Sequence, residues 1–191
     1  MTNQLDRKIA VVLSGCGHKD GTEITEAVSA LIAITETGAS YTCFAPDETA
    51  AGQSGTDSSP FEMSKRIARG HVQPLSKLNV GDFDGVVFPG GYGAAKVLSN
   101  FAEKGAKGKP LPEVTRVITE FHSQSKPIGV ICIAPALVAL TLGKLSVELT
   151  VGENGETASE IVKTGAQHTV CPVTDYISDR DNKVLSTPAY M

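Results

Sequence analysis

The stretch PIGVICIAPALVALTL, residues 127–142, carries the clearest signal of fold in this chain. Its first part, residues 127–131, is a short apolar run typical of a strand that is covered on both faces of a parallel sheet. Its last part, residues 136–142, is an apolar helix, and Cys132 stands at the corner between the two. A nucleophile on a sharp strand-to-helix turn is the arrangement known as a nucleophile elbow.

Two interpretations of Cys132 stay open at this point. The strict elbow pattern has glycine two residues before and two residues after the nucleophile, where this chain has Val130 and Ala134. A cysteine buried passively in the core is the common alternative. If the elbow forms, the N-terminus of the following helix favours the thiolate over the thiol.

Strand and helix patterns alternate on both sides of this stretch. Residues 8–14, 41–45 and 84–89 are further apolar runs that predict strands. Residues 46–60 have no periodicity and predict a surface excursion. No internal repeat or linker divides residues 1–191, so the sequence predicts a single doubly wound α/β domain, whose ligands would collect at the carboxyl ends of the strands.

Apolar residues at helical spacing predict the helices between these strands. The first helix has its predicted inward stripe at Ile24, Ala27, Val28, Leu31 and Ile32, with Gly38 as a C-terminal cap. Another is predicted over residues 112–124. A short helix is predicted to begin after a Ser59 cap, with Pro60 at its first position and Glu62 at its third, and to stop at Gly70.

Composition excludes several classes of function. The 191 residues are 41% hydrophobic and 20% charged, with a formal net charge of −4, which favours an ordered globular protein and offers no basic surface for nucleic acid or an anionic membrane. The apolar runs are too short or too broken to span a membrane, and the N-terminus lacks the apolar stretch of a secretory signal. Four cysteines without a CxxC pair fit a reducing compartment.

Chemistry-bearing residues follow three of the predicted strands, so their side chains and amides should converge at one sheet edge. Glu23 and Glu26 lie in the first turns of the helix after the first strand, where either carboxylate could meet Cys132 and move a proton. The alternative for Glu23 is a capping arrangement with Asp20, since acidic residues are favoured in a first helical turn. Gly90 and Gly91 offer backbone amides to an oxyanion, with turn formation as the alternative role.

Two further residues are candidates for accessory roles. Cys16 could be a resolving thiol if its strand neighbours that of Cys132, although passive packing is the commoner fate. His18 is the histidine with a plausible approach to Cys132. The chain has no HExxH or HxxxH pair and no cysteine cluster of metal spacing, so we expect no metal site.

A set of motifs spread over the whole chain resembles the ElbB (enhancing lycopene biosynthesis) branch of the ThiJ/PfpI superfamily, within the class I glutamine-amidotransferase-like group. The motifs are Leu13-Ser-Gly-Cys-Gly, Asp20-Gly-Thr-Glu-Ile-x-Glu-Ala, Cys43-Phe-Ala-Pro-Asp47, Phe88-Pro-Gly-Gly-Tyr-Gly-Ala-Ala-Lys96, Leu98-Ser-Asn-Phe-Ala102, Cys132-Ile-Ala-Pro135, Leu149-Thr-Val-Gly152 and Ser186-Thr-Pro-Ala-Tyr190.

The resemblance implies a fold and a site. It implies a flavodoxin-like three-layer α/β sandwich with a mostly parallel central sheet, with Cys132 as the elbow cysteine and Glu23 as the carboxylate beside it. It also implies that the backbone amides of Gly90, Gly91 and Ile133 bind the oxyanion.

The resemblance implies a glutathione-independent, glyoxalase III-like lyase. Such an enzyme would convert methylglyoxal or glyoxal to a 2-hydroxy acid through a cysteine hemithioacetal, without cofactor or metal. The expected partners are a small 2-oxoaldehyde substrate and further copies of the chain, most simply in a homodimer. The alternative function is that of a non-catalytic redox-sensing or stress-response binding protein. The expected location is the cytoplasm, or mitochondria if the chain is a processed eukaryotic form; the branch is also loosely associated with isoprenoid biosynthesis.

Two departures from relatives of the superfamily narrow the chemistry. PfpI-type peptidases place a histidine directly after the cysteine, where this chain has Ile133, so a Cys-His hydrolase is disfavoured. Glutaminase domains use an H-x-E pair, and none of the four histidines here is followed two residues later by Glu, which disfavours glutamine hydrolysis.

Overall fold

A computed structural model describes residues 6–17, 19–47 and 59–190 of the chain. The strands in this part are β1 (Lys8–Val12), β2 (Ser40–Ala45), β3 (Val72–Pro74), β4 (Gly85–Phe88), β5 (Ile128–Ile131), β6 (Glu148–Leu149), β7 (Gln167–His168), β8 (Ile177–Asp179) and β9 (Val184–Thr187). The α-helices are α1 (Ile24–Glu36), α2 (Pro60–Ile67), α3 (Tyr92–Lys96), α4 (Phe101–Lys104), α5 (Pro112–Ser123), α6 (Pro135–Leu142) and α7 (Glu156–Lys163).

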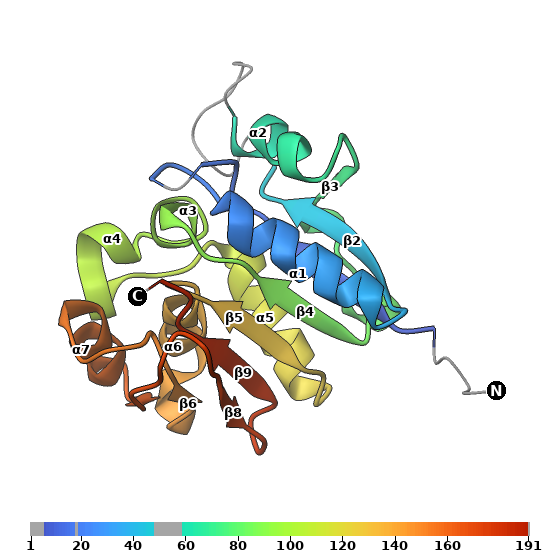
Figure 1. Ribbon diagram of the computed structural model, residues 1–191. Coiled ribbons are helices and arrows are strands. Elements are labelled where there is room, and N and C mark those ends of the chain that lie inside the picture. The colour runs from blue at the N-terminus through green and yellow to red at the C-terminus, as the bar shows by residue number, and fades with distance from the viewer. Residues whose placement is uncertain (1–5, 18, 48–58, 191) are drawn as a thin grey trace.

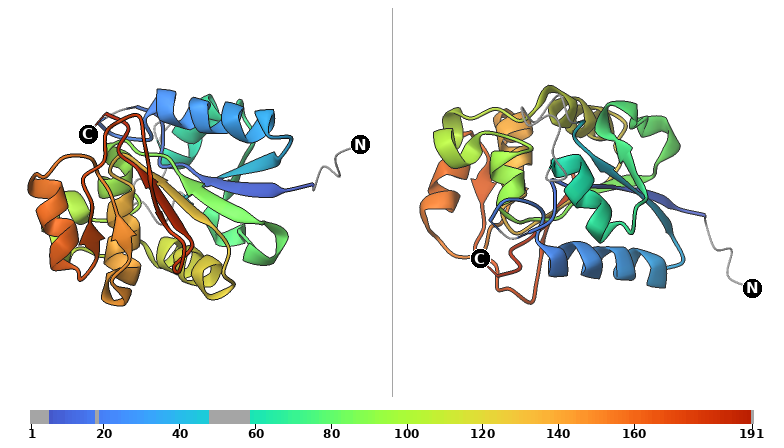
Figure 2. Two further views of the ribbon diagram at one scale, coloured as in Figure 1. Left: turned by 60° about the horizontal axis from the view of Figure 1, so that its bottom comes forward. Right: turned by 90° about the horizontal axis from the view of Figure 1, so that it is seen from above.

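The central sheet has seven strands in the order β3-β2-β1-β4-β5-β9-β8. Every neighbouring pair from β3 to β9 is parallel, and only the edge strand β8 runs antiparallel to its neighbour. Helices lie on both sides: α1 crosses the front of the sheet in Figure 1, and Figure 2 (left) shows α1 on one side and α5 and α6 on the other. The predicted three-layer α/β sandwich with a mostly parallel sheet is confirmed.

Alternate strand residues pack against opposite helix layers. On one side, Val11 and Leu13 pack with Ala27 and Leu31 of α1 and with Ile67 of α2. The larger core cluster lies on the other side of the sheet and is built largely from fully buried residues of β4, α5, β5 and α6, among them Phe88, Val117, Ile118, Phe121, Ile128 and Leu137. Because helices cover both faces of the sheet, its strands carry apolar residues at successive positions.

The inward face of α1 differs from the stripe predicted from the sequence. Of the five predicted residues only Ala27 and Leu31 are buried, whereas Ile24, Val28 and Ile32 are 48%, 38% and 53% exposed. The face that packs on the sheet is rotated from the predicted one: the buried residues of α1 are Glu26, Ala27 and Leu31, and Ile34 is partly buried against the core. This rotation matters because it turns a charged residue of α1, Glu26, toward the interior.

The other predicted elements lie close to their expected bounds. The Ser59 cap is confirmed, since its hydroxyl accepts a hydrogen bond from the Glu62 amide at 3.2 Å, and α2 ends at Ile67, before Gly70. The helix predicted over 112–124 is α5. Most of the surface excursion predicted over 46–60 lies outside the described residues. Helices α3, α4 and α7 were not predicted; α3 and α4 are too short for apolar periodicity to stand out.

In the described ranges, no helix has the length and apolarity needed to cross a membrane. Among the same residues, no group of three or more His, Cys, Asp or Glu side chains is arranged to hold a metal ion.

The packing of α5 on the sheet generates a stability prediction. Phe121 is fully buried, so Phe121→Ala should lower the free energy of unfolding by about 3–5 kcal/mol through lost burial and a residual cavity. Thr119→Ala, on the exposed side of the same helix, should change it by less than about 0.5 kcal/mol. Urea denaturation followed by circular dichroism measures both, and similar losses in the two variants would contradict this description of the core.

Candidate active site

Cys132 stands at a strained corner between β5 and α6. Its φ is +61°, in the left-handed region that a side chain other than glycine adopts at a cost of about 1–3 kcal/mol. Its amide donates to the carbonyl of Thr187 at 2.8 Å, and the amide of Ala134 donates back to the carbonyl of Ile131 at 3.0 Å. Pro135 then begins α6 at once. The predicted strand-to-helix corner is therefore present, with the cysteine at the strained position.

The carboxylate beside Cys132 belongs to Glu26. Glu26 and Cys132 are 7% and 8% exposed, and the thiol is hydrogen-bonded to the carboxylate. The amide of Gly90 donates to Glu26 Oε2 at 2.9 Å, which fixes the carboxylate against the end of β4. Only glycine fits between these groups, because a Cβ on Gly90 would lie 2.5 Å from the Cβ of Cys132 and 2.5 Å from Glu26 Oε2.

Glu23, the carboxylate that the family resemblance placed beside the cysteine, has a different part in the structure. It is the N-cap of α1, and its Oε2 accepts a hydrogen bond from the Glu26 amide at 2.7 Å. Its own amide donates to the carbonyl of Gly90 at 2.9 Å. The expectation that Glu23 pairs with Cys132 is thus wrong, because the carboxylate beside the cysteine is that of Glu26. The capping alternative for Glu23 is confirmed, although Glu23 itself occupies the cap rather than Asp20.

Two backbone amides face the sulfur. The N–H groups of Gly91 and Ile133 both donate to Cys132 Sγ. Gly90 was expected to provide a third donor, but its N–H is taken by the Glu26 carboxylate. The structure therefore offers two amide donors, rather than the expected three, to an oxyanion bound beside Cys132.

The environment keeps the proton on the thiol. Burial, followed by the charge of Glu26, raises the pKa of Cys132 to about 12, and the Gly91 and Ile133 hydrogen bonds offset this only in part. The expectation that the helix N-terminus would favour the thiolate is therefore wrong. The physical reason is that the sulfur lies in the core next to a carboxylate, where a second negative charge is costly.

Hydrogen bonds between loops hold the site in register. The amide of Gly93 donates to the carbonyl of Gly21 at 3.0 Å, and the Ser14 amide donates to the Thr22 hydroxyl at 2.7 Å. Gly91 has a φ of +91°, and a Cβ there would overlap the Glu23 amide nitrogen. The loops that follow β1 and β4 therefore approach more closely than side chains would allow.

The accessory candidates differ in outcome. Cys16 follows β1, and β4 lies between β1 and the strand that carries Cys132, so the condition for a resolving thiol fails. Cys16 is half-buried against the core cluster on the α1 side, whereas Cys132 belongs to the other cluster. His18 lies outside the described residues, and its accessory role stays a prediction. Glu26, named as an accessory candidate, is the carboxylate that contacts the sulfur.

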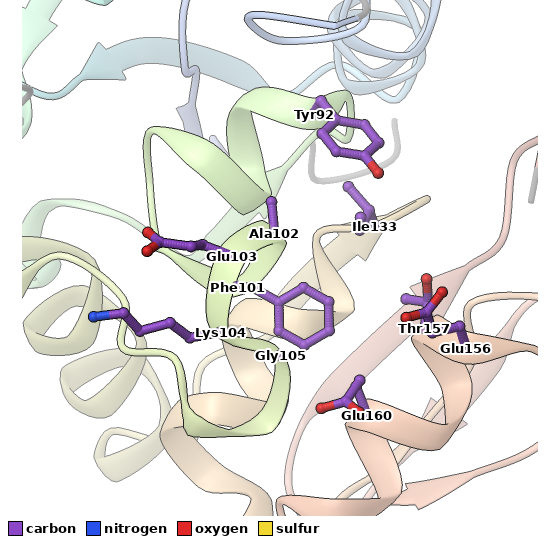
Figure 3. A pocket seen from close by; sticks show the side chains of 10 residues that line it. All are labelled: Tyr92, Phe101, Ala102, Glu103, Lys104, Gly105, Ile133, Glu156, Thr157 and Glu160. Atoms are coloured by element: carbon purple, nitrogen blue, oxygen red, sulfur yellow. The ribbon is translucent and has the colours of Figure 1, made fainter.

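A cavity of about 390 Å³ begins beside the elbow. Figure 3 shows Tyr92 and Ile133 next to each other at one end, with Phe101 along one wall and Glu156, Thr157 and Glu160 of α7 across from it. Of these lining residues, only Ile133 was predicted as a site residue from the sequence. Tyr92 follows the Gly90-Gly91 pair and could have been found from that motif, whereas nothing in the sequence linked α7 to the site.

Comparisons with known proteins give close relatives. No family model matches the chain. It is 43% identical over 202 residues to human glutamine amidotransferase-like class 1 domain-containing protein 3, mitochondrial, a match that covers 96% of this chain and 75% of that protein. It is 36% identical over 208 residues to the zebrafish ES1 protein, mitochondrial, covering 96% and 76%.

Solved structures with a similar fold include a relative in sequence. An isoprenoid biosynthesis protein with an amidotransferase-like domain from Ehrlichia chaffeensis has a TM-score of 0.83 and 36% identity, over 96% of this chain and 89% of that one. A ThiJ/PfpI domain protein from Brachyspira murdochii has a TM-score of 0.61 and 12% identity, over 95% and 86%, and this likeness shows the fold alone. The chain belongs to the class 1 glutamine amidotransferase-like family that includes the ES1 proteins.

Proposed function

We propose that this chain is a glyoxalase-type enzyme that converts a small 2-oxoaldehyde to a 2-hydroxy acid without glutathione or another cofactor. The observation that carries the proposal is the convergence of one thiol, one carboxylate and two amide donors at Cys132. A thiol can add to an aldehyde, a carboxylate can carry protons, and paired amides can hold the oxygen. Glutamine hydrolysis is less well supported, since no histidine in the chain precedes a Glu by two residues.

The first step is addition of the thiol to the aldehyde. Glu26 accepts the proton of Cys132 as the sulfur bonds to the aldehyde carbon, and the C=O electron pair moves to the oxygen. The amides of Gly91 and Ile133, which donate to the sulfur in the free site, are placed to hold that oxygen. Proton return from Glu26 to the oxygen gives a neutral hemithioacetal. Because the carboxylate removes the proton during attack, the step needs no preformed thiolate.

The second step is an internal oxidation and reduction. Glu26 removes the proton from the carbon bonded to sulfur, giving an enediol, and a proton is then placed on the neighbouring carbon. The former aldehyde carbon is oxidised to a thioester while the former ketone carbon is reduced to an alcohol, so no external oxidant is needed. Water then cleaves the thioester, which releases the 2-hydroxy acid and restores the Cys132 thiol.

The names of the relatives bear on location. The human and zebrafish proteins are both called mitochondrial, so we propose the mitochondrial location in preference to the cytoplasmic one. The expected homo-oligomer stays a prediction.

The same geometry favours a second candidate function, reversible oxidation of Cys132 in a stress-response protein. The two amides that donate to the sulfur would also donate to the oxygens of a sulfinate. Against this, the raised pKa leaves little of the thiolate that peroxide attacks.

Loss of either the Cys132 thiol or the Glu26 carboxylate should abolish the proposed reaction. Cys132→Ser and Glu26→Gln should each lower the rate of lactate formation from methylglyoxal by about 100-fold or more, since each removes the nucleophile or its general base. Glu23→Gln keeps a carbonyl oxygen for the cap and should retain activity. An enzymatic lactate assay measures all four proteins, and equal activity in the wild type, Cys132→Ser and Glu26→Gln would sink the mechanism.

Glu26 should also control the ionisation of Cys132. Replacing it by Gln removes the negative charge that raises the thiol pKa, so the thiolate fraction at pH 9 should rise, by about tenfold for each unit of pKa decrease. Iodoacetamide labelling of the Cys132 peptide, followed by mass spectrometry, measures this. Cys43, whose pKa burial raises to about 11, is the internal control and should label at an unchanged rate. Slower labelling of Cys132 in Glu26→Gln would contradict the electrostatic account.

Mild peroxide discriminates the redox candidate. If the protein is a sensor, intact mass should show oxygen added to the wild type and none to Cys132→Ser under the same conditions. Because the thiol is mostly protonated, we expect Cys132 to stay unmodified until the peroxide concentration also oxidises the half-buried Cys16. Oxidation of Cys132 first would favour the sensor over the enzyme.

A further inference from the structure

Two residues that line the cavity beside the elbow are also next to the reacting groups in the sequence. Ile133 lines the cavity, and its amide donates to the Cys132 sulfur. Tyr92 lines it as well and directly follows Gly91, which provides the other donor. A carbonyl compound held by these two amides therefore has its remaining atoms beside the mouth of the cavity.

The cavity has more room than the smallest substrates would fill. Its volume is about 390 Å³, whereas the five non-hydrogen atoms of methylglyoxal occupy at most about 150 Å³ if each takes the volume share of a water molecule in the liquid. By the same measure the cavity holds about thirteen non-hydrogen atoms. A six-carbon 2-oxoaldehyde with three hydroxyl groups has eleven and fits this space.

The walls favour a hydroxylated and uncharged chain. Phe101 and Ile133 give an apolar side, and α7 presents the Thr157 hydroxyl and the carboxylates of Glu156 and Glu160. Glu160 is held by the Ala106 amide at 2.7 Å and by an ion pair with Lys163. In Figure 3 the side chains of Glu103 and Lys104 extend away from α7.

Charge in the cavity works against anionic ligands. The Ala106 hydrogen bond and the Lys163 contact lower the pKa of Glu160, so it is ionised at neutral pH. A phosphorylated ligand would meet this charge and that of Glu156, whereas sugar hydroxyls can donate to the Glu156 carboxylate and exchange hydrogen bonds with Thr157.

We infer that the cavity binds the hydroxylated tail of a longer, uncharged, sugar-derived 2-oxoaldehyde, and that Thr157 and Glu156 determine this specificity. The inference rests on the proposed function, because the aldehyde end must react at Cys132. The chemistry is unchanged: the aldehyde carbon is oxidised, the adjacent ketone carbon is reduced, and water releases a longer 2-hydroxy acid.

The test compares substrates in the wild-type protein. We expect kcat/KM for 3-deoxyglucosone, a six-carbon 2-oxoaldehyde, to exceed that for methylglyoxal by at least tenfold, with little activity on its phosphorylated counterpart. Activity on methylglyoxal without a preference for the longer substrate would overturn this inference and leave the proposed function standing. Absence of activity on every 2-oxoaldehyde would remove both.

Matched variants locate the preference in the cavity. Thr157→Val keeps the shape of the side chain and should lower the ratio of the two kcat/KM values about tenfold, whereas Thr119→Val, exposed on α5, should leave the ratio unchanged. Glu156→Gln should raise relative activity on the phosphorylated compound, and Glu153→Gln, which lies outside this cavity, should not. Equal effects of a cavity variant and its control would show that the preference arises elsewhere.

Discussion

The hydrogen bond from the Gly90 amide to the buried Glu26 carboxylate holds the site together. It joins the helix that follows β1 to the loop that follows β4, and it sets the carboxylate against the cysteine that follows β5. The strands β1, β4 and β5 are neighbours in the sheet, and they bring the segments that follow them into one contact. Glu26 and Gly90, which this hydrogen bond joins, are 64 residues apart in sequence. Without this bond the carboxylate would be buried next to an apolar core with less to offset its desolvation.

This arrangement is costly, and the surrounding fold must offset the cost. Cys132 adopts a left-handed backbone conformation, the carboxyl group of Glu26 is buried, and Gly90 and Gly91 cannot be replaced without overlap. Strain of this kind persists only where the neighbouring structure over-determines it. Here β5 and α6, on either side of the corner, belong to the larger core cluster, so relaxing the corner would disturb fully buried packing.

The sequence predicted the frame of the fold well because parallel strands and long amphipathic helices leave strong apolar patterns. The elbow was predictable for the same reason, since the pattern changes from strand to helix at Cys132 itself. The residues alone left open whether Glu23 or Glu26 meets Cys132, and the family resemblance favoured Glu23. The apolar spacing of α1 could not decide between them, because only Ala27 and Leu31 of the predicted inward stripe are buried. The walls of the cavity come from α4 and α7, short helices that tertiary packing places beside the elbow without a local sequence signal.

The pairing of a protonated thiol with a carboxylate also controls when the site reacts. In the free protein the proton stays with the sulfur, and the two amides that would stabilise an oxyanion donate to the sulfur instead. A stray electrophile or oxidant therefore meets a buried thiol rather than a thiolate. The proposed 2-oxoaldehyde substrate would differ, because its oxygen can accept the hydrogen bonds of the Gly91 and Ile133 amides while its carbon bonds to the sulfur. In the reaction we propose, the energy that favours attack appears only when a carbonyl oxygen is present at that place, so the geometry that makes the resting cysteine unreactive would also select the class of substrate.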